Sequence, residues 1–438
     1  MRKNFPDIRK TTTMSRKEQK NFGCEGFRLE LSAAINRLPG DFAQSQVSIS
    51  PDGKLVALSP LYFEAPEEGS PALILYRNTG DGLEEIARLD VDPAFPLATG
   101  AATNESLTLF ALLEVSEEGT LRIRVFELDC NLQLAEVRTI ELDEQVDVFG
   151  ATVLFPQLFR NHYATISFTN TDNQLVVLVV DVNTGAVVAR VTPQGAGTSN
   201  IAYLFELDKK VYLAVGTGAR NAETGAILAP FFLEIYRLNC PKTVLVERVG
   251  VPNFLNDIDS PLHFGDGCET LLAVGTSRAI GIGQANIIPP RVNPPPAVPP
   301  PFSFTGEPGG VLVYHFDGKR LALAALIPQL IAVVGVEFYP DGDYIAVNTA
   351  TSAGAIAFDQ TLVYRLERGC DPSLEQIAKV RLAKVTYCPN LVDSKPAPAS
   401  SFISQFSDNG KWFAVSGGYG APTGLPQLLL YRVFAKKC

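Results

Sequence analysis

The chain has 438 residues, of which 46% are hydrophobic and 19% are charged, so it has enough apolar material for a large core and lacks the composition of a disordered protein. Its net charge at pH 7 is −10. A chain of this length is expected to form two or three domains unless a repeat architecture takes up the length.

Residues 1–22 form a basic tail. The first twenty residues contain seven Lys or Arg against Asp7 and Glu18, a balance of +5 that leaves −15 for the rest of the chain. An acidic body repels phosphate backbones, which argues against nucleic-acid binding by the body. The tail lacks the apolar segment of a secretory signal, and we interpret it as a solvated or packed arm, with contact to an anionic surface as the alternative. The compartment stays open between a cytoplasmic and a virion-like setting.

From Gly23 onward the chain repeats one kind of β-hairpin. An alternating apolar strand is followed by Asp-Gly or Asn-Gly, which tolerate the positive φ of tight hairpin turns, and then by a second strand. Three clear copies are VSISPDGKLVALS from Val47, VEFYPDGDYIAVNT from Val336 and FISQFSDNGKWFAVSGG from Phe402. Weaker copies begin at Gly100, Gly150, Ile201 and Leu262, which brings the number of predicted hairpins to seven.

A third strand follows each hairpin and is centred on an aromatic residue in six of the seven copies, as in LILYR, EIYRL and LVYRL. The first six copies continue into a fourth strand, and the seventh does not. Pro328 and Gln329 divide the apolar stretch from Leu321 to Phe338, which begins in the fifth of these fourth strands. We expect this stretch to form a strand, a turn and a strand, and no membrane span is predicted.

The seventh unit needs an outer strand from elsewhere, because its edge would otherwise stay unpaired. Glu25–Ile35 is the unassigned strand-like segment, and it lies at the other end of the chain. We expect it to pair with Gln427–Phe434 and to close a ring between the first and the last unit.

These units predict an all-β fold, a seven-bladed β-propeller over residues 23–438 whose N-terminal strand completes the last blade. Two stacked β-sandwiches are the alternative, but seven matched units and an orphan strand favour the propeller. The SPDGK-type hairpins and LYRL-type strands resemble the WD-repeat and YVTN/lactonase-like β-propeller superfamily over nearly the whole chain after Gly23. The resemblance implies the architecture and no particular activity.

Partner contacts are expected on one face of the propeller. The loops between second and third strands are long, and since strands alternate in direction within a blade, these loops share a face with the connections between blades. Binding residues concentrate on long loops held by a rigid scaffold. The candidate contact residues there are Tyr62, Phe63, Arg220 and Tyr419.

A proline-rich insertion, residues 284–308, interrupts the fifth blade. Eight of the fourteen residues in PPRVNPPPAVPPPF, residues 289–302, are proline. Such a run is preset toward polyproline II and loses little entropy on docking. It is expected either to bind a partner, with Arg291 and Phe302 as contacts, or to pack on its own propeller.

Catalytic motifs are not recognised. Neither GxxxxGK[ST] nor GxSxG occurs, and the three histidines fall in different blades. His263 with Asp257, Asp259 and Asp266 is the one acidic cluster where a hard cation could bind, and we interpret the aspartates instead as turn residues that bond their own backbone. No cofactor and no metal are predicted.

Cysteine positions suggest one covalent staple. Cys24 precedes the N-terminal strand and Cys438 follows the strand expected to pair with it, so a Cys24–Cys438 disulfide would secure the closure; in a reducing compartment both would be free thiols. The single tryptophan, Trp412, is expected in the core.

The predicted function is non-catalytic: a protein–protein interaction module or structural scaffold within a larger assembly, with protein partners. The alternatives are a lactonase-like small-molecule hydrolase that uses the central channel and a glycan-binding propeller.

Overall fold

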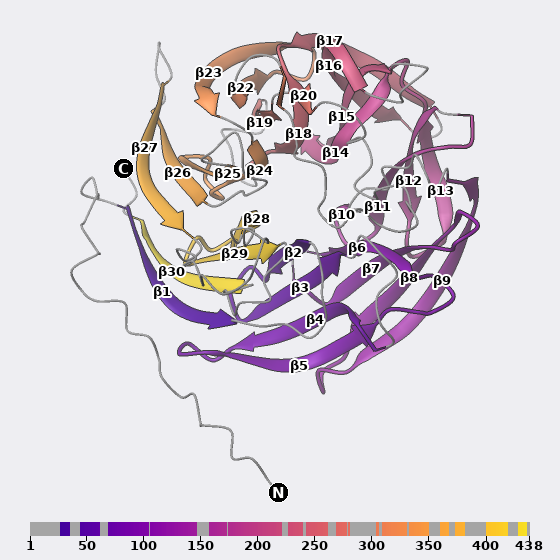
Figure 1. Ribbon diagram of the computed structural model, residues 1–438, viewed down its shortest axis with the longest axis vertical. Coiled ribbons are helices and arrows are strands. Elements are labelled where there is room, and N and C mark those ends of the chain that lie inside the picture. Colours follow the sequence, from indigo (N-terminus) through magenta and orange to yellow (C-terminus); the bar gives the residue numbers. More distant parts are fainter. Residues whose placement is uncertain are drawn as a thin grey trace, which may run out of the picture.

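The structure is a computed structural model that describes residues 27–35, 44–61, 69–104, 106–146, 157–172, 174–220, 227–239, 242–261, 269–277, 279–280, 304–305, 309–330, 333–349, 360–367, 373–381, 400–418 and 428–435. These residues form seven four-stranded antiparallel sheets around a central axis, as Figure 1 shows. The predicted β-propeller is therefore confirmed. The described part of the chain contains no helix, and hence none long and apolar enough to cross a membrane.

Each blade runs from an innermost strand to an outermost one in chain order, except for the last. Blade 1 consists of β2 (Gln44–Ile49), β3 (Leu55–Leu61), β4 (Pro71–Asn78) and β5 (Leu83–Asp90), and blade 2 of β6 (Leu97–Thr103), β7 (Leu109–Val115), β8 (Thr120–Leu128) and β9 (Leu134–Gln145). Blade 3 consists of β10 (Gln157–Phe159), β11 (Tyr163–Thr169), β12 (Leu175–Asp181) and β13 (Ala186–Val191), and blade 4 of β14 (Ala196–Leu207), β15 (Lys210–Arg220), β16 (Ile227–Asn239) and β17 (Lys242–Val251).

Blades 5 to 7 follow the same order until the chain closes. Blade 5 consists of β18 (Phe254–Asp259), β19 (Thr270–Ser277), β22 (Gly309–Phe316) and β23 (Leu321–Leu330), and blade 6 of β24 (Val333–Phe338), β25 (Tyr344–Thr349), β26 (Gln360–Glu367) and β27 (Ser373–Arg381). Blade 7 consists of β28 (Ser400–Phe406), β29 (Trp412–Gly418), β30 (Leu428–Ala435) and β1 (Phe27–Ile35). The stretch from Leu321 to Phe338 forms two strands, as predicted, but β23 continues through Pro328 and Gln329, where the break was expected, and ends at Leu330.

The ring closes where β1 pairs with β30. The pairing runs antiparallel from Phe27 opposite Ala435 to Ile35 opposite Leu428, which confirms the predicted seam. Figure 1 shows the indigo β1 alongside the yellow β30 on the outside of the ring. The two ends of the chain thus contribute to one sheet, and the last blade has the same four strands as the others.

A β-bulge recurs at one position in every outermost strand. It lies opposite the residue at the centre of the third strand, which is Tyr76 in blade 1, Tyr364 in blade 6 and Tyr431 in blade 7. The bulge of blade 7 is in β1, where the register shifts between Leu31 and Ala33. Because bulges twist an edge strand and interrupt its pairing surface, they hinder edge-to-edge association. β1 therefore has the same local geometry as the fourth strand of the other blades.

The core lies between blades and is built from the middle strands. Six or more consecutive residues are buried along β7, β12 and β25, since both faces of these sheets pack against neighbouring blades. The largest fully buried side chains include Phe110, Phe168, Phe316 and Phe413. The outermost strands are more exposed, and β5 consists of half-buried and exposed residues only.

The first hairpin strand of blade 5 differs from the prediction. The expected hairpin began at Leu262, but the innermost strand is β18, which ends at Asp259 and pairs with β19. Residues 262–268 lie outside the described residues. Asp257 and Asp259 interrupt the apolar alternation of β18, so the apolar pattern did not mark this segment as a strand.

Candidate functional site

The predicted partner contacts lie largely outside the described residues. This is so for Tyr62, Phe63 and Tyr419 on the long loops and for Arg291 and Phe302 in the proline-rich insertion. Arg220 is the last residue of β15, where its backbone pairs with Ile227 at the start of β16. The contact residues therefore stay predictions.

The ends of the proline-rich insertion lie side by side. β20 (Ala279–Ile280) and β21 (Phe304–Thr305) form a two-stranded ribbon in which Ala279 is opposite Thr305. Residues 281–303 lie between the two strands and outside the described part of the chain. The ribbon fixes where the insertion leaves and rejoins blade 5.

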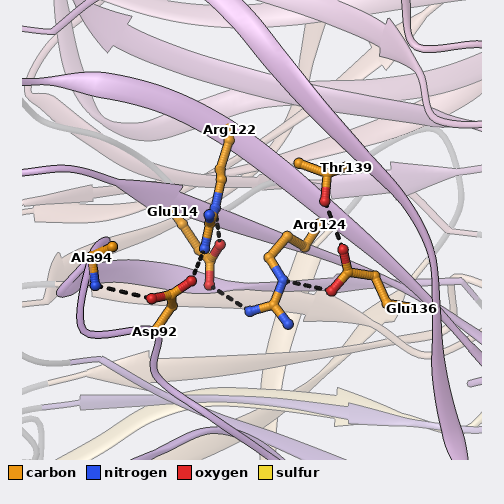
Figure 2. A network of polar contacts seen from close by, with 7 residues as sticks. All are labelled: Asp92, Ala94, Glu114, Arg122, Arg124, Glu136 and Thr139. Carbon is orange, nitrogen blue, oxygen red and sulfur yellow. Dashed lines mark hydrogen bonds and ion pairs between the residues drawn. The ribbon is translucent and has the colours of Figure 1, made fainter.

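A buried network of charged side chains connects blades 1 and 2 near the strand ends on the long-loop face of the propeller. Glu114 on β7 has no exposed side-chain surface, and Arg122 on β8 donates to it at 2.6 Å. Arg122 also donates to Asp92, which follows β5, at 2.5 Å, and its guanidinium lies 3.6 Å from the ring centroid of Phe95. Figure 2 shows the side chains of Asp92, Glu114 and Arg122 converging between the strands.

The outer half of this network reaches the surface. Arg124 contacts Glu114 at 3.3 Å and donates to Glu136 on β9 at 2.9 Å, and Thr139 donates to the same carboxylate. Burial raises the pKa of Glu114, while the hydrogen bond and charge of Arg122 act to lower it. With two arginines and three carboxylates in contact, the network supplies the partners that its buried charges require, so we assign it a structural role.

A second set of polar residues lies on the innermost strands beside the central axis. The second strands of blades 5, 6 and 7 have an alanine at the same position of the repeat, which is Ala273, Ala346 and Ala414 in turn. The residues that pair with these alanines on the innermost strands are Asp259, Glu337 and Gln405. We call Asp257, Asp259 and Glu337 the acidic row. Their side chains keep some exposed surface although they lie deep in the ring.

The aspartates of the acidic row bond the next blade. Asp257 accepts from the backbone N–H of Val336 at 2.9 Å and from that of Ile258 at 3.0 Å. Asp259 accepts from the N–H of Phe338 at 2.6 Å and from the hydroxyl of Tyr203 at 2.8 Å. Both oxygens of each carboxylate are therefore occupied. The interpretation of these two residues as turn aspartates was wrong, because they lie in β18 and their longest-range partners are on β24.

The same bond recurs in the next two blades. Glu337 accepts from the backbone N–H of Phe406 in blade 7, and Gln405 accepts from that of Ile49 in blade 1 at 2.9 Å. In each case the acceptor occupies the position opposite the alanine, and the donor is one residue beyond that position in the following blade. The acidic row is thus part of a repeated blade-to-blade contact.

Burial is the largest influence on the acidity of this row. It raises the pKa of Asp257 well above the usual value and that of Asp259 to about 6, while backbone N–H donors oppose the change. The pKa of Glu337 is also raised well above the usual value, first by burial and then by repulsion from Asp259 and Asp257. Burial thus opposes ionisation of these three carboxyl groups, and their hydrogen-bond donors favour it.

The histidines do not meet these carboxylates within the described residues. His315 Nε2 lies 2.7 Å from Glu269 Oε2 at the surface, and His162 contacts the edge of the Tyr163 ring. His263 and Asp266 lie outside the described part. Among the residues that the structure describes, no group of three His, Cys, Asp or Glu side chains has an arrangement that could hold a metal ion.

Cysteine and tryptophan positions complete the account of the predicted residues. Cys24 and Cys438 lie outside the described ranges, so the disulfide stays a prediction. Cys130 is an exposed free thiol after β8. Trp412 is half-buried and packs against the core of blades 7, 1 and 2, as expected.

A cavity of about 600 Å³ opens between blades 1 and 2 at the side where the hairpin turns lie. Its lining includes Lys54, Arg77 and Leu132. Lys54 is paired with Asp52 at 2.8 Å, and Arg77 lies 3.5 Å from Glu84. The charges at this cavity are therefore balanced by the chain itself.

Comparison with known proteins identifies the fold. No family model matches the chain, and no curated protein matches its sequence. A chain in the crystal structure of the mitotic checkpoint complex matches with a TM-score of 0.54 and 9% identity, covering 99% of this chain and 98% of that one. A chain of Kuenenia stuttgartiensis hydrazine synthase matches with a TM-score of 0.51 and 11% identity, over 91% and 96% of the two chains.

A third similar structure is the β-propeller domain of Cps50 (Swd1) from Myceliophteria thermophila, with a TM-score of 0.48, 10% identity and coverage of 94% and 100%. The first two matches extend over nearly the whole length of both chains, so the overall arrangement is shared. Since one matched chain belongs to a checkpoint assembly and another to an enzyme, the fold alone does not assign an activity.

Proposed function

We propose that the protein is a non-catalytic interaction module, or scaffold, within a larger assembly. The observation that carries the proposal is the use of the acidic row. Asp257 and Asp259 accept hydrogen bonds on all four of their carboxylate oxygens, and Glu337 accepts from the adjoining blade. These side chains connect blade 5 to blade 6 and blade 6 to blade 7, which is a structural use of the carboxylates on these innermost strands.

The proposed binding surface is the face that carries the long loops and the proline-rich insertion. A closed ring with buried middle strands provides a rigid base for such loops. The candidate contacts are Tyr62, Phe63, Arg220, Tyr419, Arg291 and Phe302. A protein partner is favoured over nucleic acid, because the chain outside residues 1–20 carries a net charge of −15.

The test is affinity purification from the native source with four matched baits: the full chain, a chain lacking residues 284–308, Arg220→Ala and Glu337→Gln. The proposal expects a saturable partner that is retained by Glu337→Gln and reduced by deletion of the insertion or by Arg220→Ala. Retention of every partner by all loop variants would exclude this face as the binding surface.

A lactonase-like hydrolase is the second candidate, because three carboxylates lie on neighbouring inner strands. A hydrolase of that kind would lose activity on substitution of the acidic row. Assay of a panel of lactones with added Ca²⁺, comparing the full chain with Asp259→Asn, separates the two. Turnover that depends on Asp259 would favour the hydrolase.

A further inference from the structure

The outermost strand of blade 5, β23, differs from its counterparts in its side chains. Among the seven outermost strands that the structure describes, it is the one without a charged residue. Edge strands usually carry charges that hinder association. Leu323 and Leu326 are exposed to 55% and 48%, and Leu321 beside them is half-buried. β23 therefore presents an apolar surface at the rim of the ring.

These three leucines lie on the side of β23 that faces blade 4. Their partners on β22 all pack in the core between blades 4 and 5, and they are Phe316, Tyr314 and Leu312. Residues that pair across an antiparallel sheet share one face, so the leucines point toward blade 4. On blade 4, Val244 pairs with Arg237, which in turn pairs with Tyr212 of the same core. Val244, which is 44% exposed, therefore faces the leucines of blade 5.

Basic residues gather beside this apolar surface. They are Lys209 and Lys210 at the β14–β15 turn, Arg237 on β16, and Lys319 and Arg320 at the β22–β23 turn. The two turns are in contact, because the Tyr212 hydroxyl lies 3.5 Å from the carbonyl oxygen of Gly318. The cations and the leucines thus belong to one continuous surface, which we call the blade 4–5 edge.

The acidic residues of the two turns do not balance these cations. Asp208 is paired with Lys210 at 2.7 Å, and Asp317 accepts from the backbone N–H groups of Lys319 and Arg320 at 2.8 Å. Five cations against these two carboxylates leave a balance of +3, in a chain whose net charge is −10. Hairpin turns of other blades carry aspartates, including Asp81, Asp129 and Asp341. The blade 4–5 edge is therefore a local exception to the acidic surface.

We propose that the blade 4–5 edge is a docking site for an acidic segment of a protein partner that also carries aliphatic side chains. Its carboxylates pair with the cations of the two turns, and its aliphatic side chains cover the leucines of β23. The basic turns lie on the face opposite the long loops, so this site is separate from the proposed loop face.

A peptide fits this surface better than an anionic membrane does. A membrane would approach the whole face that carries the hairpin turns and would meet the aspartates of blades 1, 2 and 6, which repel it. A short segment contacts only the two basic turns and the strand beside them. Charge and shape together favour the segment.

Fluorescence anisotropy with three short labelled peptides tests the proposal on the full chain. In the probe, glutamate alternates with leucine, and the two control peptides replace either the leucines with serine or the glutamates with lysine. The probe is expected to bind saturably and more weakly as salt is added, and each control peptide should bind at least about tenfold more weakly. A chain lacking residues 284–308 should bind the probe as the full chain does, which separates this site from the loop face.

Two variants with matched controls locate the site. Lys319→Glu combined with Arg320→Glu should weaken probe binding at least about tenfold, and Leu323→Ser should weaken it by about tenfold. The controls are Lys411→Glu, in a hairpin turn of blade 7, and Leu245→Ser, because Leu245 is exposed on the side of β17 that faces blade 3. Both controls should leave the affinity unchanged. If a variant does not fold, the three peptides on the unmodified chain still decide.

A probe that does not bind, or that binds no better than the two control peptides, would overturn the proposal. So would equal losses in the site variants and their controls. Sedimentation of the chain with phosphatidylserine vesicles, without binding of the probe, would also overturn it and would assign the surface to lipid.

Discussion

The indole of Trp412 lies directly against the backbone of Gly53, so that a Cβ placed on Gly53 would be 1.9 Å from the indole Cδ1. Trp412 begins β29 of blade 7, and Gly53 lies in the hairpin turn of blade 1 with φ at +71°. Tyr339 and Gly410 repeat the relationship between blades 6 and 7, since a Cβ on Gly410 would be 2.0 Å from the Tyr339 hydroxyl. An aromatic residue of one blade thus packs on the turn glycine of the next.

Gly53→Ala should destabilise the ring through this contact. The added methyl group meets the indole, and the left-handed backbone is strained for any L side chain, so we expect a loss of about 3 kcal/mol in the free energy of unfolding. The matched control is Gly69→Ala, because Gly69 also has positive φ but its Cβ would meet nothing within 4 Å. It should cost about 1–2 kcal/mol. Equal losses in urea unfolding would show that the Trp412 contact carries no specific weight.

Deletion of residues 1–35 should open the ring at β30. The deletion removes buried Phe27 and Ala33 and leaves the edge of β30 unpaired. We expect a loss of more than about 3 kcal/mol in the free energy of unfolding, together with concentration-dependent aggregation. Deletion of residues 1–22 is the control and should change little, and a synthetic peptide of residues 24–38 should restore the melting temperature. A chain lacking residues 1–35 that melts like the control would contradict closure by β1.

Glu114→Ala tests the charge network between blades 1 and 2. Arg122 and Arg124 would keep their other carboxylates but lose the buried one, so a cost of about 3–5 kcal/mol is expected. Glu30→Ala removes the exposed partner of Arg28 and should cost no more than about 1 kcal/mol. Thermal unfolding at equal salt measures both. A small effect at Glu114 would mean that water replaces the carboxylate.

Tyr203→Phe should make the stability of the inner wall more dependent on pH. The lost hydroxyl donates to Asp259 and acts to lower its pKa, so the pKa of Asp259 rises further above about 6 in the variant. The variant should lose roughly 1 kcal/mol at pH 5 and more at pH 8, where Asp259 is ionised without its donor. Parallel unfolding curves at the two pH values check this. A loss that is the same at both would assign Tyr203 a packing role only.

The sequence predicts the fold from local patterns and misses contacts that depend on neighbouring blades. The hairpins at Val47 and Phe402, the aromatic third strands and the orphan strand predict seven blades and their closure, because each signal lies within a few residues. Asp257 and Asp259 were misread because their partners in β24 are 79 residues further along the chain. Alignment of the hairpins on Ala273, Ala346 and Ala414 is the signal that finds the row. The β-bulge that recurs in the outermost strands has no comparable local sequence pattern by which it could be predicted.

Quantitative affinity purification with matched baits tests the proposed function most directly. The account predicts that a partner recovered with the full chain is lost or reduced at least several-fold with a chain lacking residues 284–308 or with Arg220→Ala, and is recovered unchanged with Glu337→Gln. Partner recovery that is unaffected by the loop variants but abolished by Glu337→Gln would contradict the account, because it would place binding at the inner wall rather than on the loop face.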